Sequence, residues 1–222
     1  MDYLYETHMH TAEVSACAVS TAAEQVNSYK QKGYTGIIVT DHFVNGNSTC
    51  PRALPWEKQM KHFATGYMKA KKAGDDCGLD VFFGWEFSIR GSDFLTYGLD
   101  LDFLIANPGL DLLDIESYSS LVRSNGGYLA QAHPYREAWY VEYCLPVEYH
   151  LLDGVEVLNT MDTGSVNAKA LDFAKKHNLP IQAGSDSHNS EHPAYSGIKL
   201  QKKAESIFDI IEAIKANNIA VI

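Results

Sequence analysis

Short apolar runs that alternate with helical segments are the feature of this sequence that most restricts its fold. The run 36–40 is apolar and rich in β-branched residues, as expected of a strand buried in a parallel sheet. Thr21 and Glu24 have the spacing of a capping box, which predicts a helix that ends near Gly33. Repeated βα units of this kind favour a parallel sheet, either open or closed into a barrel.

Similar signals predict the remaining elements. The expected strands are 3–8, 81–85, 128–132, 155–158, 180–183, 196–201 and 219–222, with two short strands or a hairpin within 94–105. The expected helices are 56–73, 115–124, 166–177 and 207–216. No linker, repeat or low-complexity segment interrupts this order, so a single domain over residues 1–222 is expected.

Composition limits the partners of such a domain. The 222 residues include 18 basic and 28 acidic side chains, which gives a formal net charge of −10. This charge disfavours nonspecific binding to nucleic acid or to membrane surfaces, because both require a basic surface. It suits a site that holds several divalent cations.

Targeting signals and cysteines agree with a cytoplasmic protein. No apolar run approaches the roughly 20 residues that span a bilayer, and the N-terminus does not resemble a secretion signal. The four cysteines, Cys17, Cys50, Cys77 and Cys144, share no CxxC spacing and are expected to be reduced thiols. The sequence does not indicate an oligomeric state.

Histidines and carboxylates stand where the predicted strands end. They follow five different strands and are His8, His10, Asp41, His42, Glu86, His133, Asp186 and His188. In βα barrels and doubly wound sheets, functional groups gather at the carboxyl ends of the strands. Imidazole and carboxylate groups that meet at one such edge are typical of a metal centre.

Spacing within the motifs agrees with one shared cavity. Side chains at i and i+2 of an extended segment point the same way, so His8 with His10 and Asp186 with His188 can each present a pair.

The other strand ends carry separate expectations. Asp41 and His42 are adjacent and point to opposite sides, so we expect His42 to be the ligand. Asp41 then either binds backbone groups beside the site or caps a helix or turn. Glu86 follows a buried run and needs a cation or strong hydrogen bonds there, and its two oxygens can bridge two metals. Pro134 ends the strand directly after His133.

Five motifs in this order resemble those of the PHP (polymerase and histidinol phosphatase) superfamily. They are His8-Met9-His10, Thr40-Asp41-His42, Gly84-Trp85-Glu86, Ala132-His133-Pro134 and Gly184-Ser185-Asp186-Ser187-His188, and the segment 153–157 also resembles one of the family. The resemblance covers nearly the whole chain. It implies a distorted (β/α)7 TIM-like barrel and a phosphoesterase with two or three divalent metal ions, zinc, manganese or iron, at the strand ends.

The resemblance also implies three metal positions, of which the first two share Glu86 as a bridge. The ligands would be His8, His10, Glu86 and Asp186 for the first metal, Glu86 and His133 for the second, and His42 and His188 for the third.

Two positions depart from the common pattern of the family. Many members have an Asp or His shortly after the first motif, where this chain offers Glu13 as the first candidate ligand and Cys17 as a second. Many members also have a histidine between the third and fourth motifs, and here Asp93 falls at that position. An aspartate ligand would favour a hard metal such as Mn²⁺ or Fe over Zn²⁺.

The implied chemistry is attack on phosphorus by a metal-activated hydroxide. Arg136 could grip the phosphate, or it could form a surface salt bridge. His192 could donate a proton to the leaving group, or it could line the entrance. The expected substrate is a small phosphorylated metabolite, for example a nucleotide or histidinol phosphate.

Three other interpretations remain open. An amidohydrolase would usually carry a lysine ligand at a strand end, and no lysine of this chain is suitably placed. A non-catalytic PHP module would show degraded motifs. A nuclease or phosphodiesterase would need a basic groove for the nucleic-acid backbone, which the acidic charge disfavours.

Overall fold

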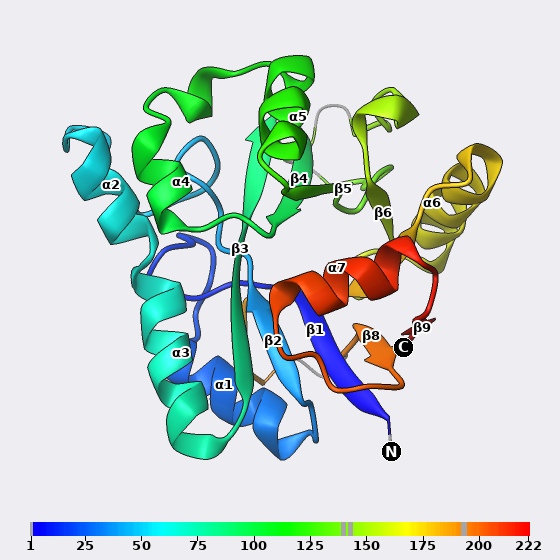
Figure 1. Ribbon diagram of the computed structural model, residues 1–222, viewed down its shortest axis with the longest axis horizontal. Helices are drawn as coiled ribbons and strands as arrows, with labels where there is room; N and C mark the ends of the chain where they lie inside the picture. Colours follow the sequence, from blue (N-terminus) through cyan, green and yellow to red (C-terminus); the bar gives the residue numbers. More distant parts are fainter. Residues whose placement is uncertain (1, 139–140, 142–143, 192–194) are drawn as a thin grey trace.

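A mixed β-sheet forms the centre of the fold (Figure 1). The computed structural model describes residues 2–138, 141, 144–191 and 195–222, and within them the strand order is β7-β6-β5-β4-β3-β2-β1-β8-β9. The strands are β1 (Tyr3–Met9), β2 (Gly36–Val39), β3 (Asp80–Ile89), β4 (Ser92–Tyr97), β5 (Tyr128–Gln131), β6 (Gly154–Asn159), β7 (Ile181–Gly184), β8 (Ile198–Leu200) and β9 (Ala220–Val221). Strands β1 to β3 are parallel to one another, as are β5 to β7, whereas β4 is antiparallel to both of its neighbours.

The sheet closes on itself because β1 has different neighbours along its two halves. Its first half pairs with β8. Beyond that, the N–H of Asp186 donates to the carbonyl of His8 at 2.8 Å, and the N–H of His10 donates to the carbonyl of Ser187 at 2.9 Å. Gly184 allows this approach, because a Cβ there would lie 2.4 Å from the Cβ of His8. Strands β1 to β7 therefore form a nearly closed ring, which confirms the predicted distorted barrel.

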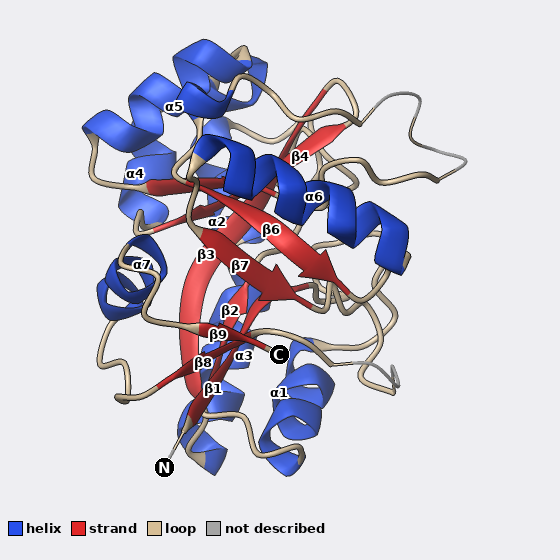
Figure 2. Cartoon of the chain, turned by 90° about the vertical axis from the view of Figure 1, so that its right-hand side faces the viewer, coloured by secondary structure: helices blue, strands red, loops and turns tan. Residues whose placement is uncertain are grey.

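Helices cover the outside of this ring (Figures 1 and 2). They are α1 (Ala22–Gln31), α2 (Trp56–Phe63), α3 (Thr65–Cys77), α4 (Leu101–Ala106), α5 (Ile115–Ser124), α6 (Gly164–His177) and α7 (Ile207–Lys215), with 3-10 turns η1 (Leu110–Leu112) and η2 (Tyr149–Leu151). Helices α1 and α3 pack against each other beside β2 and β3, and α6 packs along β6. Apolar side chains such as Phe43, Trp85 and Phe87 fill the space between ring and helices.

Most predicted elements lie where the sequence placed them. Thr21 and Glu24 form the complete capping box of α1, and α5 spans the predicted 115–124. The single helix predicted at 56–73 is wrong, because α2 ends at Phe63 and α3 begins at Thr65. The break at Ala64 brings Gly66 against Asp41, where a Cβ would lie only 2.3 Å from the carboxylate oxygen.

The segment 94–105 also differs from the prediction. Its first part is strand β4, which forms a hairpin with β3 rather than with a second strand inside 94–105. Its second part is helix α4 rather than a strand. Asp100 caps this helix by accepting a hydrogen bond from the N–H of Phe103 at 2.9 Å, and Gly98 ends the strand with a φ of +84°. The cap and the turn outweigh the apolar, strand-like composition.

Two further observations concern the chain as a whole. Within the described ranges, every helix is too short or too polar to cross a membrane. All four cysteines are free thiols, in agreement with the expectation from their spacing. The assignment of residues 1–222 to a single domain stays a prediction.

Candidate metal centre

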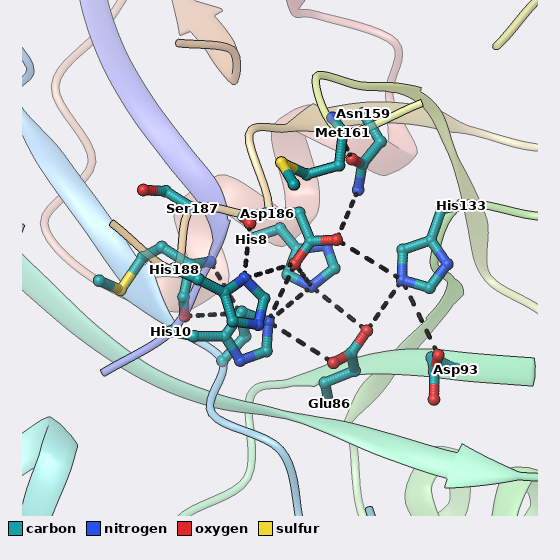
Figure 3. A network of polar contacts seen from close by, with 12 residues as sticks. His8, His10, Glu86, Asp93, His133, Asn159, Met161, Asp186, Ser187 and His188 are labelled. Carbon is teal, nitrogen blue, oxygen red and sulfur yellow. Dashed lines mark hydrogen bonds and ion pairs between the residues drawn. The ribbon is translucent and has the colours of Figure 1, made fainter. Parts of the chain in front are cut away.

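The carboxyl ends of the barrel strands bring the predicted ligands into one cluster (Figure 3). Eight of the nine candidate ligands form overlapping groups whose ligand atoms lie within 4.8 Å of one another. The groups are His8, His10 and Glu86; Glu86, Asp93 and His133; His8, His133 and Asp186; and His10, His42 and His188. These four groups overlap the three implied positions without reproducing them, because His8, His133 and Asp186 form a group that spans the first two positions and His10 also joins His42 and His188.

Glu86 on β3 lies at the centre of the cluster. Its Oε1 is 3.3 Å from His8 Nε2 and 3.0 Å from His133 Nε2. Its Oε2 is 3.5 Å from His10 Nε2 and 2.6 Å from His42 Nδ1. Because each oxygen faces a different pair of histidines, the carboxylate has the arrangement of a bridging ligand.

Hydrogen bonds fix which ring nitrogen of His8 and His10 faces the cluster. Nδ1 of His8 donates to Glu156 Oε1 at 2.9 Å. Nδ1 of His10 lies 3.0 Å from Ser15 Oγ, whose own proton goes to Asp41 Oδ1 at 2.8 Å. In both rings Nδ1 therefore carries a proton, and Nε2 points into the centre, where a metal would take the place of a second proton.

Asp186, in the loop after β7, pairs with Arg136 through one carboxylate oxygen and faces the cluster with the other. Its Oδ2 is 2.8 Å from Nη1 of Arg136, which also pairs with Asp162 at 3.0 Å. Its Oδ1 faces His10 Nε2 at 3.2 Å, as Figure 3 shows. Arg136 thus orients the aspartate in the structure, and its predicted role in gripping phosphate stays a prediction.

The same loops place two ligands in an unusual backbone conformation. His133 has a φ of +28° and Asp186 a φ of +54°, where most residues pay a steric cost on the order of 1–3 kcal/mol. The surroundings retain these conformations through hydrogen bonds. The N–H of His133 donates to Glu156 Oε2 at 3.0 Å, and the N–H of Asp186 donates to the carbonyl of His8.

Neighbouring charged groups shift the pKa values of the buried carboxylates and of one histidine in the cluster. Burial opposes the charged form of Glu86, but His42 and His8 outweigh burial and hold its pKa well below the usual range. Burial likewise opposes the charge of Asp186, and His8 and Arg136 hold its pKa low. Burial, together with nearby His188 and His42, lowers the pKa of His10, which leaves its imidazole neutral. Anionic carboxylates and a neutral imidazole are the forms that bind metals.

Several polar atoms of the cluster have no hydrogen-bond partner among the described residues. They are Glu86 Oε2, Asp186 Oδ1, His42 Nδ1 and His133 Nδ1, all buried. Buried polar atoms of folded proteins are nearly always satisfied, and a bare carboxylate oxygen is costly to bury. Divalent cations would satisfy the carboxylate oxygens, so the residues present fit a metal centre.

Asp93 enters the cluster from the β3–β4 hairpin. It pairs across the hairpin with Ser88, whose Oγ donates to Asp93 Oδ1 at 2.5 Å. Its Oδ2 lies 3.9 Å from His133 Nε2. The position deduced from the family pattern thus lies beside Glu86 and His133.

Glu13 is the candidate that the structure does not bring to the cluster. Its Oε2 accepts a hydrogen bond from the N–H of Ala22 at 2.9 Å, at the start of α1, and its Oε1 lies 3.5 Å from Lys69 Nζ. Cys17 lies at the cluster instead. Burial raises the pKa of its thiol, but interactions with His188 and His42 outweigh burial and lower it to about 6.

Two further predictions concern the edge of the site. His192 lies outside the described residues. Asp41 does not join the ligand groups, and its carboxylate accepts hydrogen bonds from the N–H of Thr11 at 2.6 Å, from Thr11 Oγ1 at 2.7 Å and from Ser15 Oγ. Of the two roles left open for Asp41, the structure favours binding to backbone groups beside the site.

Sequence reasoning did not assign a role to Glu156. This residue holds His8 Nδ1 and the N–H of His133, and it accepts a hydrogen bond from Asn159 Nδ2 at 2.9 Å. The signal was available, because Glu156 is a carboxylate inside the apolar strand β6, the same pattern that singled out Glu86. Asp162, the second partner of Arg136, carried no such signal because it lies in a polar loop.

Part of the sequence matches a known family model. Residues 164–219 match the family described as PHP-associated. No curated protein matches the sequence.

Solved structures share the fold. The chain superimposes with a TM-score of 0.76 and 15% identity on a two-domain protein from Bacteroides vulgatus described as containing a predicted PHP-like metal-dependent phosphoesterase, covering 100% of this chain and 65% of that one. A proposed metal-dependent phosphoesterase from Bifidobacterium adolescentis gives a TM-score of 0.61 at 14% identity, with 97% and 96% covered. An amidohydrolase from Chromobacterium violaceum, solved with sulfate and no metal, gives a TM-score of 0.61 at 14% sequence identity, with 97% of each chain covered.

Proposed function

We propose that this chain, which the sequence match and the shared fold support as a PHP superfamily domain, is a metal-dependent hydrolase of phosphate esters. The observation that carries the proposal is the carboxylate of Glu86, whose two oxygens face different histidines in a buried cluster. The proposed substrates are phosphomonoesters of small metabolites, such as a nucleotide or histidinol phosphate. A cytoplasmic location is proposed with them.

The proposed centre holds two or three divalent cations. Its ligands would be His8, His10, Glu86 and Asp186; Glu86, Asp93 and His133; and His42 with His188. Such cations, when bound, neutralise charge on phosphate oxygens and lower the pKa of water. The mixed imidazole and carboxylate donors suit zinc, manganese or iron.

The residues around the ligands prepare the site for an anionic substrate. Glu156 and Ser15 fix the rings of His8 and His10, so these rings need no reorientation when a ligand arrives. The three carboxylates of the cluster, Glu86, Asp93 and Asp186, would repel a phosphate until cations compensate their charge. Arg136 pairs with Asp162 and Asp186 and so compensates part of the negative charge of Asp186.

A phosphate-release screen tests the proposal. The purified protein is first analysed for bound metal, and then assayed against phosphomonoesters with added Mn²⁺, Zn²⁺ or Fe²⁺. We expect release from at least one ester class that depends on the added metal. A fully loaded protein that releases phosphate from no ester would contradict the phosphatase proposal.

Replacement of Glu86 tests the bridging role directly. Glu86→Gln removes the negative charge and one bridging oxygen, so we expect loss of bound metal and of turnover together. Metal content by mass spectrometry and phosphate release are measured on the same sample. Glu57→Gln, on the exposed face of α2 where Glu57 pairs only with Lys61, serves as the control and should keep both. Turnover retained by Glu86→Gln would rule out the bridge.

Hydrolysis of a C–N bond is the second candidate, because one protein with this fold is named an amidohydrolase. The clusters of histidines and acidic side chains among the described residues would serve either reaction, so they do not distinguish an amidohydrolase from a phosphoesterase. Assaying the loaded protein against amides and phosphate esters in parallel separates the two reactions. Amide cleavage without phosphate release would favour this second candidate.

A further inference from the structure

The third metal position has too few donors in the ligand set proposed so far. The rings of His10, His42 and His188 lie together, with centroids 4.4 Å apart for the first two and 4.1 Å for His10 and His188. His10 is already committed, because its Nδ1 contacts Ser15 and its Nε2 faces Glu86 and the first position. Two imidazoles remain, whereas a zinc ion takes four ligands.

The loop that follows β1 brings another donor to these two imidazoles. Ser15 Oγ accepts a hydrogen bond from the N–H of His42 at 3.0 Å. Four residues later, the N–H of Val19 donates to the carbonyl of His188 at 2.9 Å. The loop is therefore attached at one end to His42 and at the other to His188, and Cys17 lies midway between the attachments. Its side chain is exposed, and His188 and His42 act on its thiol strongly enough to outweigh burial and lower the pKa.

Neighbouring atoms indicate that a cation belongs there. Oε2 of Glu86, with a side chain only 1% exposed, lies 2.6 Å from His42 Nδ1, and neither atom has a hydrogen-bond partner among the residues described. His188 donates from Nδ1 to the carbonyl of Asp186 at 2.8 Å, which leaves its Nε2 as a free donor atom. Glu13, the other candidate in this loop, is bound to the start of α1.

We propose that Cys17 Sγ is a ligand of the cation held by His42 and His188, and that this position therefore prefers Zn²⁺ to Mn²⁺. The proposal rests on the metal centre of the proposed function. A thiolate with two imidazoles is a soft donor set, which suits zinc. The position formed by Glu86, Asp93 and His133 has two carboxylates and suits a harder cation. The two ends of one centre thus differ in metal preference.

Cobalt substitution tests the sulfur ligand without an activity assay. The whole chain is freed of metal with a chelator, reloaded with Co²⁺ alone, and followed by absorption spectroscopy. A thiolate bound to Co²⁺ gives an intense sulfur-to-cobalt charge-transfer band, which imidazole and carboxylate ligands do not give. We expect this band in the native protein and its loss in Cys17→Ser, with the proton of the thiol released on binding.

Matched variants exclude other origins of the band. Cys77→Ser removes a thiol on α3, away from the cluster, and Glu13→Gln removes the rival ligand, so both should retain the band. Circular dichroism checks that each variant is folded, and Cys17→Asp, which restores a hard ligand, should bind Mn²⁺ at least tenfold more tightly than the native position does. A band that survives in Cys17→Ser, or that is lost in Glu13→Gln, would overturn the proposal. Because no substrate is used, a failed phosphate screen leaves this result unaffected.

Discussion

A single carboxylate beneath the ligands decides which nitrogen His8 offers to a metal. Glu156 accepts from His8 Nδ1 with one oxygen, and from the backbone of His133 and from Asn159 with the other. All the groups that face it are donors, so only a full carboxylate satisfies them. This residue touches no position where a substrate could react, and its effect reaches the chemistry through the orientation of His8.

Glu156→Gln tests this orientation. The amide has one accepting oxygen, so one side of the residue must then face a donor with its own NH₂. If that side faces His8, the proton moves to Nε2 and the ring no longer binds metal. We expect the affinity for Zn²⁺ to fall about 10- to 100-fold, measured by competition with a chromophoric chelator. Glu148→Gln, at an exposed position, is the control, and equal affinities in both variants would contradict the role of Glu156.

Individual ligands were predictable to different degrees. His8, His10, Glu86 and His133 stand at strand ends, where the apolar run before each one indicates its direction. The sequence placed Glu13 before Cys17 as the candidate ligand after the first motif. That choice depended on the path of an irregular loop, which neither hydrophobic periodicity nor residue type determines.

At the scale of elements, the break between α2 and α3 connects packing to the site. It lets Gly66 approach the carboxylate of Asp41, which in turn orients Ser15 and His10. An apolar periodicity that continues through 56–73 conceals this break, so the sequence predicted one helix. The helix α4 was missed for a related reason, since its apolar residues are as compatible with a strand.

Gly66→Ala tests the close approach of α3. The new Cβ would lie 2.3 Å from both Asp41 Oδ2 and Thr11 Oγ1, so α3 or the Asp41 loop must shift. We expect the free energy of unfolding in urea to fall by about 1–3 kcal/mol. Gly164→Ala, at the first residue of α6 with no atom within 4 Å, is the control and should be neutral or slightly stabilising. Equal stability of the two variants would show that the contact with Asp41 is dispensable.

For the whole molecule, the barrel and the proposed centre depend on each other. The ligands come from β1, β3, β4 and the loops after β2, β5 and β7, so a bound cation would connect most of the ring. The barrel class was predictable because it follows from the order of strands and helices. The reversed direction of β4 was not predicted as such, since its apolar pattern does not specify direction.

Metal removal should therefore lower stability measurably. A cation present at 100 times its dissociation constant stabilises the folded state by about 3 kcal/mol, which corresponds to roughly 5–10 °C in Tm for a chain of this size. We expect a chelator to lower the Tm of the native protein by this amount and to leave Glu86→Gln unchanged. Differential scanning calorimetry measures both, and an unchanged Tm for native protein that loses its metal would contradict the coupling.

The two segments that close the ring, β1 and the residues after β7, are synthesised at different times. Asp186 and Ser187, which bond to His8 and His10 and so close the ring, follow these residues by almost 180 positions. At ribosomal rates of 5–20 residues per second, on the order of 10 s separates the synthesis of the two. During this interval the early histidines are exposed without their partners. If the proposed metal centre forms, its complete set of ligands would exist only after translation, and a nascent or truncated chain would offer cellular metals a partial and less selective set.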